Sequence, residues 1–136
     1  MTAPKPNTPT LGYVIIYVPD VARAVAFYQR AFGVASRFVH ESGTYAELET
    51  GATALAFADE RDTPCQGAFE PNRGDRKAAG AEVAFVVDDV RAAFDHAVAN
   101  GATVVTAPVD KPWGQTVSYV RDLDGFLVEL CSAVTH

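Results

Sequence analysis

A single carboxylate, Glu129, interrupts an apolar stretch close to the end of the chain. The stretch Phe126–Cys131 has the two-residue alternation of a β-strand, which puts Glu129 on the face opposite Val128 and Leu130. An isolated charge is costly to bury, so Glu129 must face water, a partner or a ligand. A carboxylate in such a place can transfer a proton, bind a cation or coordinate a metal ion. The plainest alternative is a solvent-exposed glutamate on an edge strand.

The strand that contains Glu129 is the second arm of a predicted hairpin. The first arm is Gln115–Val120, which carries Tyr119, a candidate ligand contact. The arms are joined by a tight turn, Asp122–Gly125, whose glycine can take a positive φ without steric penalty. Trp113 lies in the loop before the hairpin, where it either packs against the protein or contacts a ligand.

Length and charge limit the classes of function. A chain of 136 residues suggests one compact unit. The sequence has 17 acidic and 11 basic residues, a net charge of −6, which argues against nucleic acid or an anionic membrane as partner and favours a neutral or cationic ligand. No apolar run approaches the length that spans a bilayer.

The N-terminus and the cysteines predict a cytoplasmic protein. Residues 1–10 contain three prolines and no hydrophobic segment, so we expect a flexible lead and no signal peptide. Cys65 and Cys131 form neither a disulfide framework nor a metal-binding spacing, and we expect both to be reduced.

The chain contains an internal repeat at an offset of 69 residues. Tyr13–Val21 and Glu82–Val90 are each a short apolar strand that runs into an aspartate and then a helix. The aspartates are predicted N-caps and the glycines after the helices are predicted C-terminal stops; these residues are Asp20, Asp89, Gly33 and Gly101.

Strands follow each predicted helix, so each half reads β-α-β-β-β. We predict strands over 35–41, 45–50 and 52–58 in the first half, and over 103–107, 115–120 and 126–131 in the second. The predicted organisation is a first module over 11–58, a linker or lid over 59–80, a second module over 81–132 and a tail over 133–136. The linker is rich in charge, Pro and Gly and is too long for a simple connection.

Two motifs carry a family resemblance. Val18–Gly33 reads V-x-D-V-x-x-A-V-x-F-Y-x-x-x-F-G, and Asp122–Leu130 reads D-L-D-G-F-x-V-E-L. This pattern resembles the vicinal oxygen chelate superfamily of glyoxalases, bleomycin-resistance proteins, extradiol dioxygenases, epimerases and fosfomycin-resistance enzymes, over residues 11–132. The resemblance implies an α+β fold: two βαβββ modules related by a pseudo-twofold axis, whose curled mixed sheets form a cup-shaped cavity, commonly in a homodimer.

The resemblance also implies where a metal would bind. Metal-using members place ligands on the first and last strands of each module, and these positions fall on Tyr13, Ala56, Glu82 and Glu129. Glu129 matches the usual carboxylate, whereas a histidine is typical at Glu82, a histidine or glutamine at Tyr13, and Ala56 is no ligand. Catalytic divalent sites generally need three protein ligands. We therefore expect no resident cofactor; the alternative is a divalent metal (Mg²⁺, Mn²⁺, Zn²⁺ or Ni²⁺) on Glu82 and Glu129, with Glu47 completing an oxygen-only site for Mg²⁺ or Mn²⁺.

The three histidines do not complete a metal site. His136 is terminal and His96 lies off the apolar stripe of its helix, so both are expected to face solvent. His40 ends a predicted strand near the Ser42-Gly43 turn, where it either reaches a cavity rim or lies on the surface.

We expect the repeat to place Glu82 and Glu129 across the pseudo-twofold axis from each other. With Tyr13, Tyr17 and other apolar residues of the same strand faces, they would form an apolar, aromatic cup with an acidic floor. Two carboxylates there repel, so one should have a raised pKa, and the pair could transfer protons or bind a cation. The alternative is that both glutamates pair with basic residues such as Arg37, Lys111 or Arg121.

Three functions remain open on the sequence. The first is a metal-free small-molecule binding protein of the bleomycin-resistance type, which binds a neutral or cationic amphipathic ligand without turnover. The second is a glyoxalase-like lyase or isomerase that uses Glu82 and Glu129 on a metal or as a proton-transfer pair. The third is a non-catalytic dimeric scaffold, whose cavity would be filled by its own side chains.

Overall fold

The computed structural model describes residues 7–134. Part of the expected N-terminal lead (1–6), part of the expected tail (135–136) and the prediction for His136 lie outside the described residues.

The first module is a four-stranded mixed sheet with one helix. Its elements are β1 (Tyr13–Val18), α1 (Val21–Phe32), β2 (Ser36–Val39), β3 (Tyr45–Leu48) and β4 (Ala54–Asp59). The strands lie in the order β1-β4-β3-β2, with β1 and β4 parallel and the other pairs antiparallel. The helix is the crossover that allows the first and last strands to pair in parallel.

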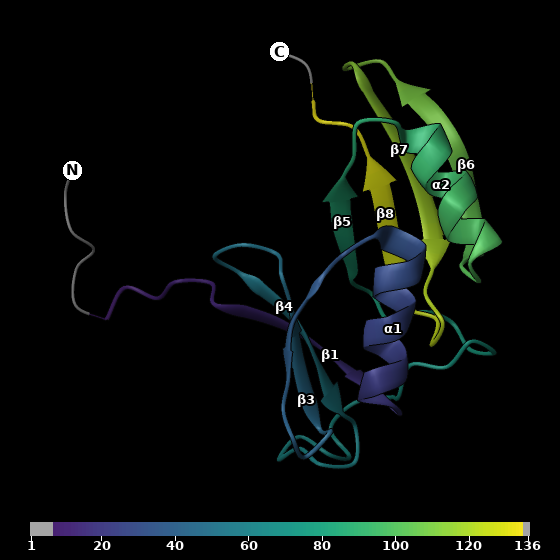
Figure 1. Ribbon diagram of the computed structural model, residues 1–136. Coiled ribbons are helices and arrows are strands. Elements are labelled where there is room, and N and C mark those ends of the chain that lie inside the picture. The colour runs from purple at the N-terminus through teal and green to yellow at the C-terminus, as the bar shows by residue number, and fades with distance from the viewer. Residues whose placement is uncertain (1–6, 135–136) are drawn as a thin grey trace.

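The second module repeats this arrangement. Its elements are β5 (Glu82–Val86), α2 (Val90–Ala99), β6 (Thr103–Lys111), β7 (Gln115–Arg121) and β8 (Leu127–Cys131), in the sheet order β5-β8-β7-β6. β5 and β8 are parallel, as β1 and β4 are. The predicted fold class is therefore confirmed: the protein is α+β, with two similar modules and open, unclosed sheets (Figure 1). No helix within residues 7–134 is long and apolar enough to cross a membrane.

Several strand ends differ from the sequence prediction, most of all in β6. We predicted an end at residue 107, before Pro108, but β6 continues to Lys111, which pairs with Gln115 of β7. The ladder register shifts between Thr106 and Val109, so the proline lies at an irregularity of an edge strand, where the missing N–H is tolerated.

The predicted caps at Asp20, Asp89 and Gly33 are confirmed, whereas the C-cap predicted at Gly101 is wrong. The side chain of Asp20 accepts a hydrogen bond from the Arg23 amide, and that of Asp89 accepts one from the Ala92 amide, both at 3.0 Å. Gly33 ends α1 with φ of 70°. α2 ends one residue earlier than the repeat predicts, at Ala99, and Gly101 takes its positive φ of 108° after the C-cap residue Asn100.

An aromatic cluster joins the two modules. Tyr28 and Phe32 of α1 contact Phe85 of β5, with ring centroids 6.3 and 5.7 Å apart, while Tyr28 also packs on Phe57 of β4 at 4.9 Å. Tyr28 and Phe57 are almost fully buried. α1 and α2 also pack against each other, so the core is continuous between the modules.

A buried hydrogen bond also connects the modules. The Tyr28 hydroxyl donates to Asp122 at 2.7 Å, and the other Asp122 oxygen accepts from the amides of Asp124 and Phe126. The carboxylate therefore closes its own turn and fixes that turn to α1. Burial raises the pKa of Asp122, although these hydrogen bonds oppose the shift.

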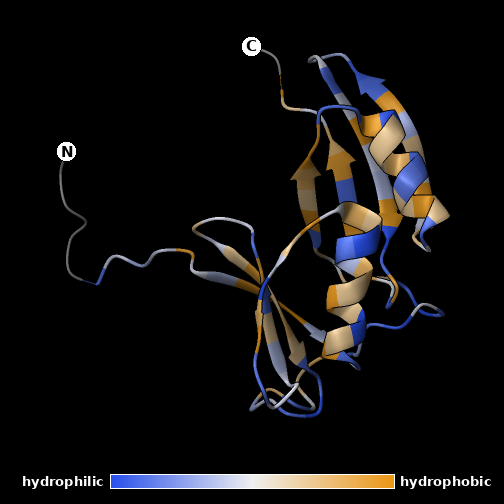
Figure 2. Cartoon of the chain, viewed as in Figure 1, coloured by the Kyte–Doolittle hydropathy of each residue, from blue (hydrophilic) through white to orange (hydrophobic). Residues whose placement is uncertain are grey.

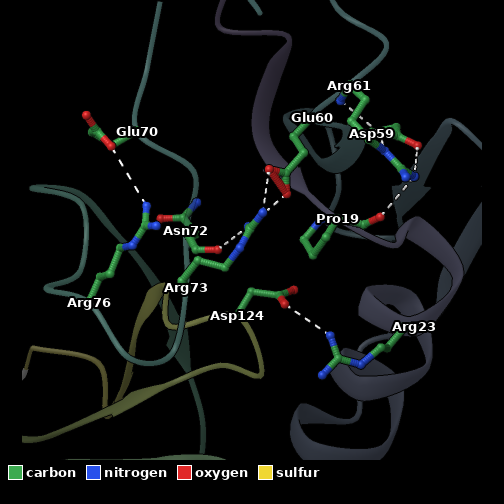
Figure 3. A network of polar contacts seen from close by, with 10 residues as sticks. All are labelled: Pro19, Arg23, Asp59, Glu60, Arg61, Glu70, Asn72, Arg73, Arg76 and Asp124. Atoms are coloured by element: carbon green, nitrogen blue, oxygen red, sulfur yellow. Dashed lines mark hydrogen bonds and ion pairs between the residues drawn. The ribbon is translucent and has the colours of Figure 1, made fainter. Parts of the chain in front are cut away.

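The segment between the modules is held by charged side chains (Figure 3). Arg73 donates to both carboxylate oxygens of the buried Glu60, at 2.9 and 3.1 Å. Arg121 donates to the carbonyls of Arg73, Arg76 and Gly125. Gly125 has a φ of 92°, and a Cβ there would lie only 2.7 Å from the Arg73 carbonyl oxygen, so the turn requires glycine in this position.

Candidate functional site

Glu82 and Glu129 lie on one face of the second sheet. β5 and β8 are hydrogen-bonded neighbours, with Glu82 opposite Leu127 and Ala84 opposite Glu129. Side chains of paired residues in parallel strands share a face, so the two carboxylates are diagonal neighbours. The expected placement across the pseudo-twofold axis is wrong, because the parallel pairing brings together the first and last strands of a single module. Figure 2 shows a hydrophilic band that interrupts the hydrophobic β8.

The two carboxylates interact electrostatically. Partial burial raises the pKa of Glu82, and a hydrogen bond with Glu129 and the charge of Glu129 raise it further. The predicted raised pKa of one carboxyl is therefore confirmed. The Glu82 carboxyl therefore gives up its proton less readily than an isolated glutamate does.

No basic residue neutralises this pair within residues 7–134. The three basic residues considered from the sequence have other partners. Arg37 binds Glu49 at 2.8 Å, Arg121 donates to backbone carbonyls, and the Lys111 ammonium lies 5.8 Å from the centre of the Trp113 ring. The alternative that these residues pair with Glu82 and Glu129 is therefore wrong.

A phenol and a thiol lie next to Glu129 in the second sheet. Tyr119 of β7 lies opposite it in the antiparallel ladder; burial raises the pKa of this phenol, and the charge of Glu129 adds to the shift. Cys131 lies two residues further along β8, and its thiol pKa is also raised, first by burial and then by Glu129. Cys131 was not among the predicted site residues, although the alternation of β8 puts it on the same face. Both groups are thus held protonated beside the carboxylate.

A cavity of about 470 Å³ lies beside Glu82, between the modules. It is lined by the whole of β5 (Glu82–Val86) and, from the first module, by apolar residues such as Val14 and Leu55. Of the predicted site residues, Glu82 alone lines this cavity. The cavity is therefore mostly apolar, with the carboxylate at one end of the strand that forms its wall.

The first module carries different groups at the equivalent positions. Ile15 pairs with Ala56 in the β1–β4 ladder as Ala84 pairs with Glu129 in the β5–β8 ladder. Ala56 is fully buried and Tyr13, the counterpart of Glu82, is 58% exposed. The register therefore supports the residue matching made from the sequence.

Glu47 has its own partners in the first sheet. Its carboxylate accepts hydrogen bonds from Tyr45 at 2.8 Å and from Arg37 at 3.4 Å. It lies on β3 of the first module, and within residues 7–134 no group of three or more His, Cys, Asp or Glu side chains could hold a metal ion, so Glu47 does not complete a site with Glu82 and Glu129. Burial and the bond to Glu47 raise the pKa of Tyr45 to about 12.

The remaining predicted contacts are spread over the molecule. Tyr17 of β1 stacks on Phe69 with ring centroids 4.6 Å apart, and its hydroxyl accepts from Thr63. His40 is exposed, with Nδ1 2.8 Å from the Ser42 hydroxyl. Trp113 is 54% exposed and donates from Nε1 to the side-chain oxygen of Gln115 at 2.9 Å. The structure gives none of these residues a contact with the carboxylate pair.

Comparison with known proteins identifies the family. The family model described as Glyoxalase/Bleomycin resistance protein/Dioxygenase superfamily matches residues 10–130. The chain belongs to this superfamily. No curated protein sequence matches this superfamily member.

Several solved structures have the same fold. A glyoxalase/bleomycin resistance protein/dioxygenase family enzyme from Burkholderia phytofirmans PsJN is 22% identical, with a TM-score of 0.78 over 93% of this chain and 100% of that one. A glyoxalase-related enzyme from Fulvimarina pelagi is 19% identical, with a TM-score of 0.75 over 93% and 97%. TioX from Micromonospora sp. ML1 is 27% identical, with a TM-score of 0.68 over 91% and 96%.

The residues present do not fit the divalent metal of the metal-using superfamily members. No group of three or more His, Cys, Asp or Glu side chains that could hold a metal ion occurs within the described part of the chain. Glu82 and Glu129 supply two carboxylates, whereas Ala56 and Tyr13 stand where further ligands would be needed. A catalytic divalent site generally takes three protein ligands, one more than this pair supplies.

Proposed function

We propose that this superfamily member is a small-molecule binding protein that holds a neutral or cationic amphipathic ligand at the Glu82–Glu129 pair. One observation carries the proposal: two carboxylates lie as diagonal neighbours on an apolar sheet face, and no basic residue among those described is paired with them. A cationic group replaces the missing basic partner, and the apolar wall of β5 accepts the ligand body.

A bound cation would compensate for the electrostatic repulsion within the carboxylate pair. A partly desolvated carboxylate pair is unfavourable while both groups are charged, as the raised pKa of Glu82 records. An ammonium or guanidinium group bound between the carboxylates lowers this repulsion and makes charge-assisted hydrogen bonds. An anionic ligand would add to the repulsion instead.

A binding screen tests this proposal. Thermal shift with cationic amphipathic compounds should raise the melting temperature of the native protein, since a ligand of the folded state stabilises it. Glu129→Gln should weaken binding about tenfold or more, the range for a lost bond to a charged group. Glu41→Gln is the control, because it removes an exposed carboxylate of the first module. Equal affinity of both variants would refute the proposal, and failure of every compound to bind would favour the scaffold.

A second candidate function is a metal-free glyoxalase-like lyase or isomerase. The raised pKa of Glu82 beside the carboxylate of Glu129 supports it, because general acid–base catalysis needs one protonated and one ionised group within reach of a substrate. Turnover of a bound compound, lost in both Glu82→Gln and Glu129→Gln, would establish this reaction; unchanged ligand recovered after incubation would leave the binding function.

We also propose that the protein works as a homodimer. Apolar side chains of both sheets are exposed, among them Ile15 at 44%, Phe38 at 42% and Val86 at 66%. A second copy that covers these faces would supply the other wall of the cup. Light scattering should give twice the mass of one chain, and Ile15→Glu should shift the protein towards the monomer. A native protein that stays monomeric at high concentration would rule out the dimer.

A further inference from the structure

A second cavity lies within the segment that connects the modules. Its volume is about 450 Å³, and the residues that line it run over Phe69–Asn72 and Arg76–Ala79. This size is within the range of small-molecule sites in proteins. The cavity shares no lining residue with the one beside Glu82.

Three contacts hold the segment that lines this cavity. Phe69 stacks on Tyr17 with an interplanar angle of 10°. Arg73, between the two lining stretches, is bound to Glu60, and the Arg76 carbonyl accepts a hydrogen bond from Arg121 at 2.6 Å. The first stretch is anchored to the first module and the second stretch to the second module. The cavity is therefore a feature of the folded protein.

The lining combines apolar residues, two basic side chains and the carboxylate of Glu70. Phe69, Pro71 and Ala78 contribute apolar surface, while Arg76 and Lys77 contribute positive charge. With two basic residues and one acidic residue, the lining has a net charge of +1, whereas the whole protein has −6. Such surroundings favour a negatively charged group attached to an apolar body.

The two cations are weakly neutralised by the protein. Other arginines, such as Arg23, Arg37 and Arg73, lie within 3.1 Å of a carboxylate oxygen. Arg76 lies 3.9 Å from Glu70, whose side chain is 95% exposed. Lys77 has no ion pair within residues 7–134. Their hydrogen-bond donors remain open to an external anion.

We propose that this cavity binds an organic monocarboxylate, with the apolar body against Phe69 and Pro71 and the carboxylate at Arg76 and Lys77. A guanidinium group presents a planar pair of donors that matches the two oxygens of a carboxylate. The site is independent of the Glu82–Glu129 pair, which selects the opposite charge.

Benzoate is the probe for this site, and benzyl alcohol is its neutral counterpart. Titration into ¹⁵N-labelled full-length protein should shift the amide signals of residues 69–79 with benzoate and leave them nearly unchanged with benzyl alcohol. Equal binding of benzyl alcohol, shifts confined to other parts of the protein, or no shifts at millimolar benzoate would overturn the proposal.

Charge variants test the assignment of the two cations. R76Q/K77Q should bind benzoate about tenfold or more weakly, whereas E70Q should bind it more tightly. R91Q is a matched control: Arg91 is 60% exposed with an ion pair at 3.7 Å, close to the 58% and 3.9 Å of Arg76. An equal loss in R91Q, or weaker binding in E70Q, would refute the assignment. Glu129→Gln should leave benzoate binding unchanged, which separates this site from the proposed function.

Discussion

In the first module, Tyr13 and Ala56 occupy the ladder positions that Glu82 and Glu129 occupy in the second. The first sheet has a carboxylate on β3 instead, that of Glu47. It accepts hydrogen bonds from Arg37 and Tyr45. One topology therefore carries a neutralised acidic group in one half and an unneutralised pair in the other. The difference shows that repetition of the backbone fixes where side chains point and leaves their chemistry free to diverge.

The largest expected loss of stability tests whether the two modules contribute equally to the shared core. Phe57 of β4 and Leu130 of β8 are the core residues compared, and both are almost fully buried. Phe57→Ala should lower the free energy of unfolding by about 3–5 kcal/mol and Leu130→Ala by about 2–5 kcal/mol, because each leaves a cavity. Denaturant unfolding measures both values. A loss of cooperativity in one variant alone would show that the modules unfold separately.

The next largest loss of stability should come from breaking the hydrogen bond that connects the modules. Tyr28→Phe leaves one oxygen of the buried Asp122 without its donor and should cost about 1–3 kcal/mol. Tyr45→Phe removes a similar bond to Glu47 at a less buried place, so it should cost about 0.5 kcal/mol. Thermal and urea unfolding would show which variant loses more stability. Equal losses in free energy of unfolding would contradict the idea that burial strengthens the contribution of the Tyr28 hydrogen bond.

Removal of a carboxylate charge should change the free energy of unfolding by a smaller amount, with opposite signs in the two sheets. Glu82→Gln should stabilise the protein at neutral pH by less than about 1 kcal/mol, allowing for solvent screening, because the amide donates to Glu129 without adding charge. The folded-state pKa of Glu82 is raised, so native stability falls as pH rises from the ordinary value of 4.5 through the folded-state pKa. The gain should therefore disappear below about pH 4.5.

The control for this prediction is the satisfied carboxylate of the first module. Glu47→Gln weakens the bonds to Arg37 and Tyr45 and should destabilise the protein by about 0.2–1 kcal/mol at neutral pH. Unfolding curves over a pH series compare the two variants. The same sign for both would remove the electrostatic distinction between the sheets.

The smallest effect concerns Trp113. Its ring is largely exposed, so Trp113→Ala should change the free energy of unfolding by no more than about 0.5 kcal/mol. Chemical denaturation provides the measurement. A cost of several kcal/mol would instead indicate a packing role for this side chain.

The sequence predicted those parts of the fold that depend on local pattern. Asp20, Asp89 and Gly33 fix helix ends through bonds to residues only a few positions away, and these were correct. The alternation of β8 also predicted which way Glu129 points. The length of β6 was missed because Pro108 is a strand breaker by local rules, and only the ladder with β7 shows that a register shift accommodates it.

The site was harder to predict than the fold. The repeat showed that Glu82 begins one strand and Glu129 lies in another, but a linear pattern does not say which strands are hydrogen-bonded. The raised pKa followed from chemistry alone, whereas the arrangement within one sheet needed the β5–β8 pairing. The stacking of Phe69 on Tyr17 and the bonds from Arg121 to the connecting segment join residues about 45–52 positions apart and have no local signature.

Within residues 7–134, no strand of one sheet forms a ladder with a strand of the other. The halves are held together by aromatic packing, by the hydrogen bond from Tyr28 to Asp122 and by the ion pair of Arg23 with Asp124. Two copies of the chain could therefore exchange one module each without breaking a β-ladder, and each copy could form the same contacts between modules with its neighbour. In such a domain swap, the length of the connecting segment would limit the distance between the two modules of one chain.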